Sequence, residues 1–267
     1  MKKILALVLA LVLMCSVFAG CGTTTAETDS DLEYVKANGS LKIGYTVYDP
    51  MNYTNEDGEF VGFDTEYAEA VCEKLGVEPE FIEINWDTKE VTLNAKDIDC
   101  IWNGFTITED REEQLDFTNP YILNKQVVVI RKDDAKKYTD TASLSDAKLT
   151  AEKASAGETA ITEDENLKKA PYVESDVQTS ALMAVKAMTA DACVVDYTVA
   201  YAMAGKGDYA DLMVIEGLDL AVEEYGIGFR TGSDLVSKVN DITAELIADG
   251  TLEEIADKYG LKDNLIK

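Results

Sequence analysis

Arg111 and the residues just before it have the clearest chemical potential in this 267-residue sequence. Thr108 can cap a helix, because its hydroxyl can accept a free backbone N–H, and this places Arg111 in the first helical turn. A guanidinium beside unpaired backbone N–H groups and the positive end of a helix dipole suits a small carboxylate. The stretch from Trp86 to Arg111 has no nucleophile beside a base and no cluster of metal ligands. These residue types indicate binding rather than catalysis.

Plainer interpretations of the same residues remain open at this point. Arg111 stands among four acidic residues and could form an exposed ion pair on a helix. Trp86 and Trp102 could be core residues, as tryptophan usually is. Asp196 could simply cap a helix that begins at Tyr197.

The elements expected around Arg111 are a helix, a strand and a loop. Apolar spacing over residues 91–96 predicts a short helix, and alternation over residues 98–102 predicts a buried strand. We expect residues 103–106 to form a polar loop that leads to the helix capped by Thr108.

The N-terminal 21 residues have the pattern of an export signal. Two lysines precede an apolar run over residues 4–18, which is shorter than the roughly 20 residues that a membrane-spanning helix needs. Small residues stand directly before Cys21, so the segment resembles the bacterial lipoprotein signal, with Phe18 where an aliphatic residue is usual. The alternative is an ordinary secretory signal cut near Ala19.

We therefore expect residues 1–20 to be a signal peptide, Cys21 to carry a lipid and residues 21–30 to be a tether. No later apolar stretch is long enough to cross a bilayer, which places the mature chain outside the membrane.

Composition excludes several functional classes. With 24 basic and 51 acidic residues the formal charge is −27, which repels nucleic acid and anionic lipid. The sequence has no histidine, which argues against Ser-His or Cys-His catalysis and against a zinc site. Cys72, Cys100 and Cys193 are an odd number at unrelated spacings, so we expect no disulfide framework, and we expect no metal or cofactor.

An α/β pattern occurs twice along the chain. Ser30 and Glu33 are spaced as a capping box for a helix that stops at Gly39, and Thr251 and Glu254 are spaced in the same way. Tyr48, Trp86, Asn103 and Arg111 each follow a predicted strand, where open α/β sheets bind ligands. The predicted strands are 41–45, 80–85, 98–102, 126–131, 149–153, 172–173, 192–195 and 225–230, and the longer predicted helices are 31–38, 64–76, 157–169, 177–189, 234–248 and 251–259.

From about Leu41 to its C-terminus the chain resembles the solute-binding protein family 3, the amino-acid-binding extracellular receptors of ABC importers. The resemblance depends on the order and spacing of four motifs: Gly62-Phe63-Asp64, Thr106-Ile107-Thr108 with Arg111, Asp116-Phe117-Thr118, and Asp249-Gly250-Thr251. It implies an α/β fold of the type II periplasmic-binding class, a two-lobed clamp in which each lobe is a sheet flanked by helices and two crossover strands join the lobes. The implied boundaries are 31–123 plus 221–267 for lobe one, 127–217 for lobe two, and hinges at about 123–126 and 218–223.

The resemblance also implies ligand-binding residues. Arg111 matches the arginine that holds the ligand α-carboxylate, and Asp196 matches the aspartate that holds the α-ammonium. In lobe two, only Ser155 keeps a hydroxyl where many relatives have two, so we expect the contact there to depend on backbone N–H groups at a helix start. The other implied residues are Tyr48 and Trp86 as aromatic walls, Asn103, Gly104 and Thr106 on the polar loop, and Ala156 and Gly157 beside Ser155.

The implied function is a receptor that binds a free amino acid and delivers it to an ABC permease. It would be a monomer, held by the lipid on Cys21 at the extracellular face of a bacterial membrane, or on the periplasmic side if there is an outer membrane. The alternatives are an enzyme of the cyclohexadienyl dehydratase type, whose acid or base would be Glu158 or a lysine, and a sensory binding module.

The same comparison with relatives predicts a neutral ligand. Relatives that bind basic amino acids place an acid where this sequence has Tyr45, Thr46 and Val47, and apart from Arg111 no basic residue stands among the implied ligand-binding residues. We therefore expect a neutral amino acid, either polar, such as glutamine or cystine, or modestly apolar.

Overall fold

The structure, a computed structural model, describes residues 30–267. The expected signal peptide, Cys21 and all but the last residue of the tether lie outside the described residues. No helix in the described range is long and apolar enough to cross a membrane. Cys72, Cys100 and Cys193 are buried free thiols.

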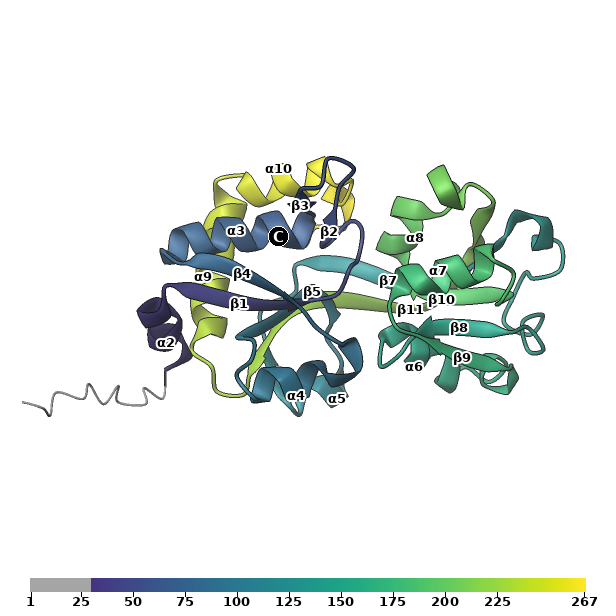
Figure 1. Ribbon diagram of the computed structural model, residues 1–267, viewed down its shortest axis with the longest axis horizontal. Coiled ribbons are helices and arrows are strands. Elements are labelled where there is room, and N and C mark those ends of the chain that lie inside the picture. Colours follow the sequence, from purple (N-terminus) through teal and green to yellow (C-terminus); the bar gives the residue numbers. More distant parts are fainter. Residues whose placement is uncertain (1–29) are drawn as a thin grey trace, which may run out of the picture.

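One sheet runs through both lobes of the molecule (Figure 1). Its strand order is β4-β1-β5-β11-β7-β10-β8-β9, and β6 pairs with the last residues of β11. The long antiparallel neighbours β7 (Ile122–Arg131) and β11 (Leu212–Arg230) connect the two halves, which confirms the two-lobed clamp with two crossover strands. The other strands are β1 (Ser40–Tyr45), β4 (Glu78–Glu83), β5 (Cys100–Thr106), β6 (Leu115–Phe117), β8 (Leu149–Glu152), β9 (Tyr172–Ser175) and β10 (Ala192–Asp196).

Lobe one contains β1, β4, β5 and β6, and β1 is parallel to both β4 and β5. Figure 1 shows α3 and α10 above this part of the sheet and α4 and α5 below it. A small hairpin of β2 (Tyr53–Thr54) and β3 (Phe60–Val61) precedes α3. The helices of this lobe are α2 (Asp31–Asn38), α3 (Phe63–Leu75), α4 (Lys89–Asn94), α5 (Glu109–Glu112), α9 (Leu235–Ala248) and α10 (Thr251–Lys258).

Lobe two contains β8, β9 and β10 with α6 (Ala156–Glu163), α7 (Gln178–Lys186) and α8 (Tyr197–Met203). Successive residues of a strand point to opposite faces, and residues 127–130 of β7 are buried on both. Val127 and Val129 join the apolar cluster that includes α7 and α8, whereas Val128 and Ile130 join the cluster that includes α6. Helices cover both faces, which explains why these four residues form a continuous apolar run.

Arg230 is the last residue of β11, and only 8% of its surface is exposed. Its guanidinium forms an ion pair with Asp31 of α2 at 3.1 Å and another with Asp99 at 3.5 Å. It also donates to the carbonyls of Leu93 at 3.1 Å and Ile98 at 2.8 Å. This one side chain therefore connects α2, α4, the start of β5 and the end of β11.

Several predicted elements are confirmed. The helix 31–38 has the predicted bounds, with the Ser30 hydroxyl accepting the Glu33 N–H at 3.0 Å and Gly39 ending the helix at φ 74°. Thr108 caps α5 as expected, since its hydroxyl accepts the Arg111 N–H at 3.3 Å.

Two predicted elements and one predicted helix cap are among the expectations that are wrong. Residues 103–106 belong to β5 rather than to a loop, because the sheet buries all of this polar stretch. The helix expected over 157–169 ends at Glu163, where the Asp164 carboxylate accepts the N–H groups of the next turn. Thr251 caps no helix, since it lies inside α10 and its N–H donates to Asp249 at 3.0 Å.

Candidate functional site

Residues from both lobes line a narrow cavity at the place where the lobes meet. Nine of the ten expected ligand-binding residues are in this lining; the tenth, Gly157, is not, and its Cα lies close to the backbone of Val194. Glu152 and Gln178 line the cavity as well, although the sequence analysis did not name them. The nine expected residues are Tyr48, Trp86, Asn103, Gly104, Thr106, Arg111, Ser155, Ala156 and Asp196.

Arg111 reaches the cavity from lobe one. Its guanidinium lies 4.6 Å from the centre of the Phe105 ring and donates to the Thr106 carbonyl at 2.7 Å. A second N–H donates across the cleft to the Ala154 carbonyl of lobe two at 3.4 Å. Burial lowers the pKa of Arg111, although the side chain remains a cation. The alternative of an exposed ion pair is therefore not supported, and the guanidinium faces the cavity.

Asp196 reaches the cavity from lobe two, at the end of β10. Asp196 stands at the N-cap position of α8, but its side chain makes no capping bond, so capping does not account for the carboxylate. Three amides donate to the carboxylate: Asn124 at 2.9 Å to Oδ1, Gln126 also to Oδ1, and Gln178 to Oδ2. Gln178 also accepts the Asp196 N–H at 2.9 Å, which holds the carboxylate in place from two sides.

Glu223 lies behind Asp196 on the crossover strand β11. Asn124 donates to Glu223 Oε1 at 2.5 Å and Gln126 donates to the same oxygen at 2.8 Å. Burial, followed by the charge of Asp196, raises the pKa of Glu223. Two neighbouring buried carboxyls do not both ionise easily, and of these two it is Asp196 that lines the cavity.

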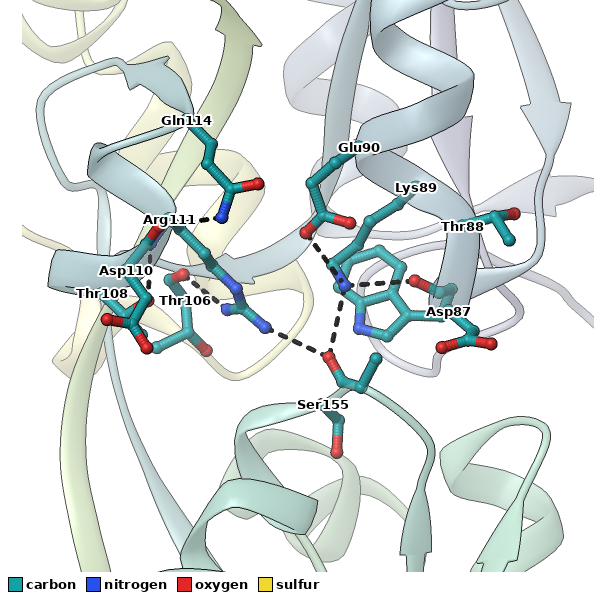
Figure 2. A network of polar contacts seen from close by, with 12 residues as sticks. Asp87, Thr88, Lys89, Glu90, Thr106, Thr108, Asp110, Arg111, Gln114 and Ser155 are labelled. Atoms are coloured by element: carbon teal, nitrogen blue, oxygen red, sulfur yellow. Dashed lines mark hydrogen bonds and ion pairs between the residues drawn. The ribbon is translucent and has the colours of Figure 1, made fainter.

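Lys89 brings a second cation to the contact between the lobes (Figure 2). This residue was not predicted from the sequence. The side chain is 2% exposed and its Nζ lies 4.9 Å from the centre of the Trp86 ring. The ammonium donates to the carbonyls of Trp86 at 3.1 Å and Ala154 at 3.2 Å, and it pairs with Glu90 at 3.2 Å. Two cations of lobe one therefore converge on one carbonyl of lobe two, at Ala154.

The polar residues of β5 are used mainly within lobe one. Asn103 accepts the Thr46 N–H at 3.0 Å and donates to Asn52 at 2.8 Å, so its amide supports the end of β1. Gly104 has a φ of 56° and lies against the Tyr48 ring, and its N–H donates to Asp64 at 2.6 Å. These groups shape the wall of the cavity, because the donors and acceptors expected to grip a ligand already have partners.

Tyr48 forms a second contact between the lobes. Its ring is buried, and its hydroxyl lies 2.5 Å from the Thr198 hydroxyl of lobe two and 2.6 Å from the Tyr225 hydroxyl. The expected aromatic wall at this position is therefore also part of the closed arrangement of the two lobes.

In lobe two the loop before α6 approaches the cavity. The Ser155 hydroxyl accepts the Glu158 N–H at 3.2 Å, so its role in the structure is to cap α6. Glu158, the acid on which an enzymatic alternative depends, is not among the residues that line the cavity. Its carboxylate accepts the Ala154 N–H at 2.7 Å and the Tyr172 hydroxyl at 3.0 Å.

Glu152 is the last residue of β8 and is 3% exposed. The rule that ligands bind at the carboxyl ends of strands could have identified it from the sequence, since it is a charged residue at the end of an apolar strand. The expectation of a neutral ligand depended on the absence of an acid at residues 45–47 and of a cation other than Arg111. Glu152 supplies an acid to the lining, and Lys89 supplies a cation beside it.

Comparisons with known proteins agree with this geometry. The family model of the bacterial extracellular solute-binding proteins, family 3, matches residues 41–262. The chain is 26% identical over 250 residues to the L-cystine-binding protein TcyJ of Escherichia coli K12, covering 93% of this chain and 92% of that protein.

Two solved structures are similar. An ABC uptake transporter substrate-binding protein from Streptococcus pneumoniae with bound histidine has a TM-score of 0.80 and 30% identity, over 90% of this chain and 99% of that one. The ancestral amino-acid-binding protein AncCDT-1, described as a precursor of cyclohexadienyl dehydratase, has a TM-score of 0.78 and 29% identity, over 86% and 99%. With a family match over most of its length, a clamp of the type II periplasmic-binding class and opposed charges at the contact between its lobes, this chain belongs to the bacterial extracellular solute-binding proteins of family 3.

Proposed function

We propose that this protein is a lipid-anchored extracellular receptor that binds a free amino acid between its lobes and delivers it to the permease of an ABC importer. The observation that carries this proposal is the pairing of Arg111 from lobe one with Asp196 from lobe two at one cavity. A free amino acid carries the complementary charges on its α-carboxylate and α-ammonium. A ligand held in this way satisfies both charges only when the lobes close around it.

The hinge of the proposed motion coincides with irregular pairing between β7 and β11. The ladder between β7 and β11 shifts register between Val214 and Asp219 and again between Asp219 and Ala221, near the expected crossing at 218–223. We propose that the chain bends there and at 123–126, between lobe one (31–123 plus 221–267) and lobe two (127–217). The cavity leaves room for about one water molecule, so an amino acid would enter only after the lobes separate.

A thermal-shift screen against the twenty amino acids and cystine tests the proposed function. A ligand that binds only the folded state raises the melting temperature by mass action, so at least one compound is expected to raise it in a concentration-dependent way. If none does at millimolar concentrations, the proposal of an amino-acid receptor is wrong.

We further propose that the protein is not an enzyme and acts as a monomer. The similarity to AncCDT-1 is the reason to consider an enzymatic alternative, but Glu158 does not line the cavity and its carboxylate accepts hydrogen bonds from Ala154 and Tyr172. Depletion of candidate cyclic acids by the purified protein would overturn this part of the proposal.

The proposed anchor is the lipid on Cys21, after removal of residues 1–20. Cys21→Ala is expected to leave the protein folded but released from the membrane, because the described residues contain no helix that could span a bilayer. Fractionation of cells into washed membranes and supernatant measures this, with the unaltered chain as the control. Retention of the variant in washed membranes at the level of the control would contradict the anchor.

A further inference from the structure

The Glu152 carboxyl has a buried oxygen without a hydrogen-bond donor, and it lies in the lining of the proposed ligand cavity. It lines the same cavity as Arg111 and Asp196, and its residue is 3% exposed. Its Oε1 atom is buried and accepts no hydrogen bond from the described residues. Burying a polar group without a hydrogen bond costs free energy, and each such group in a folded protein needs an explanation.

Nearby cations do not satisfy this carboxyl. Lys89 is close enough to influence it electrostatically, but the Lys89 ammonium is committed to two carbonyls and to Glu90. Arg111 donates to the carbonyls of Thr106 and Ala154 and makes no hydrogen bond to Glu152. The described residues therefore supply no donor to Glu152 Oε1, and a group that occupies the cavity can supply one.

The α-groups of an amino acid have other partners in the proposed function. Arg111 would take the α-carboxylate and Asp196, held in place by three amides, would take the α-ammonium. Glu152 is then left for a third group of the ligand, on its side chain. We propose that Glu152 is a specificity-determining residue that accepts a hydrogen bond from a side-chain N–H of the bound amino acid. This inference rests on the proposed function and refines its substrate class to amino acids with a second nitrogen-bearing group.

The protonation of Glu152 agrees with this role. Burial, followed by the charge of Asp196, raises the pKa of Glu152 to about 8, while Lys89 opposes that shift. A neutral carboxyl still accepts a hydrogen bond from an amide through its carbonyl oxygen. A ligand ammonium or guanidinium favours the ionised form instead, because an opposite charge at close range lowers the pKa of a carboxyl.

The test uses isothermal titration calorimetry with the full mature chain and a panel of ligands. Glutamine, asparagine, arginine, lysine, histidine and cystine carry a second nitrogen, and leucine, methionine and glutamate do not. The tightest ligand of the unaltered protein is expected in the first group. Glu152→Leu is expected to weaken that ligand at least tenfold and to leave the affinity for leucine or methionine unchanged or higher. If the leucine variant does not fold, Glu152→Ala takes its place.

Glu152→Gln separates the two kinds of nitrogen. A glutamine still accepts from an amide but cannot pair with a cation, so loss of binding indicates a cationic ligand and retention indicates an amide. Glu174→Gln is the matched control, because Glu174 is exposed on the neighbouring strand β9 and does not line the cavity. Its affinity is expected to stay within twofold of the unaltered chain.

Two results would overturn the role of Glu152. One is a tightest ligand without a side-chain nitrogen, and the other is binding of the preferred ligand by Glu152→Leu or Glu152→Ala within threefold of the unaltered protein. Neither result would contradict the proposed receptor function, because an amino acid would still bind. Failure of every amino acid to bind would instead overturn the proposed function.

Discussion

Replacing Arg111 by alanine is expected to weaken amino-acid binding by two orders of magnitude or more. In the closed cleft the variant leaves the ligand α-carboxylate without a charged partner, and an unpaired buried charge typically costs several kcal/mol. A hundredfold loss corresponds to about 2.8 kcal/mol. Asp196→Asn is expected to have a loss of the same order for the α-ammonium, because it keeps the size of the side chain and removes the charge.

Isothermal titration calorimetry with the ligand found in the thermal screen measures both losses. Glu109→Gln is the matched control, because it removes a charge from α5 two residues before Arg111, at a residue that is not in the lining shared by Arg111 and Asp196. Its affinity is expected to stay within threefold of the unaltered chain. An Arg111→Ala or Asp196→Asn variant that also stays within threefold would show that the charge pairing is not what holds the ligand.

Arg230→Met is expected to lower the free energy of unfolding by about 3–5 kcal/mol, the usual cost of removing one partner from a buried ion pair. The variant leaves Asp99, which is 1% exposed, without its cation, and it leaves the carbonyls of Leu93 and Ile98 without a donor. It also releases α2, which the guanidinium holds through Asp31.

Urea unfolding followed by circular dichroism measures this effect. Lys74→Met is the control, because Lys74 pairs with Glu245 at 3.2 Å on the surface of lobe one, where an ion pair is worth roughly 0–1 kcal/mol. Equal unfolding free energies for the Arg230 and Lys74 variants would mean that the Arg230 network contributes no more than a surface pair.

The sequence predicted an element correctly where residues within one turn of its ends determine where it starts and stops. The helix 31–38 is correct to the residue because its cap, Ser30, and its stop, Gly39, act within one turn. The same kind of signal failed at Thr251, because Asp249 lies close enough to accept the N–H that a capping box would have satisfied.

Long-range contacts account for the other errors. The polar stretch 103–106 gave no strand pattern, because what makes it a strand is burial between β1 and β11, distant in sequence. Asn103 is tolerated there only because Thr46 and Asn52 satisfy its amide. Lys89 was overlooked for a related reason, since its role depends on a carbonyl of the opposite lobe that the sequence does not place beside it.

The position of β11 in the sheet has a consequence for the order in which the molecule assembles. β11 lies between β5 and β7, yet it is the last strand of the chain. Until it has been synthesised, the strands before it can pair only as two separate groups, β4-β1-β5 in one lobe and β7-β10-β8-β9 in the other. Burial of Tyr225, Ile227 and Phe229 then joins the groups through contacts with a long loop to close, which are slow to form. The central strand is thus the last strand to be synthesised, and the two groups of strands are not joined into one sheet before it is present.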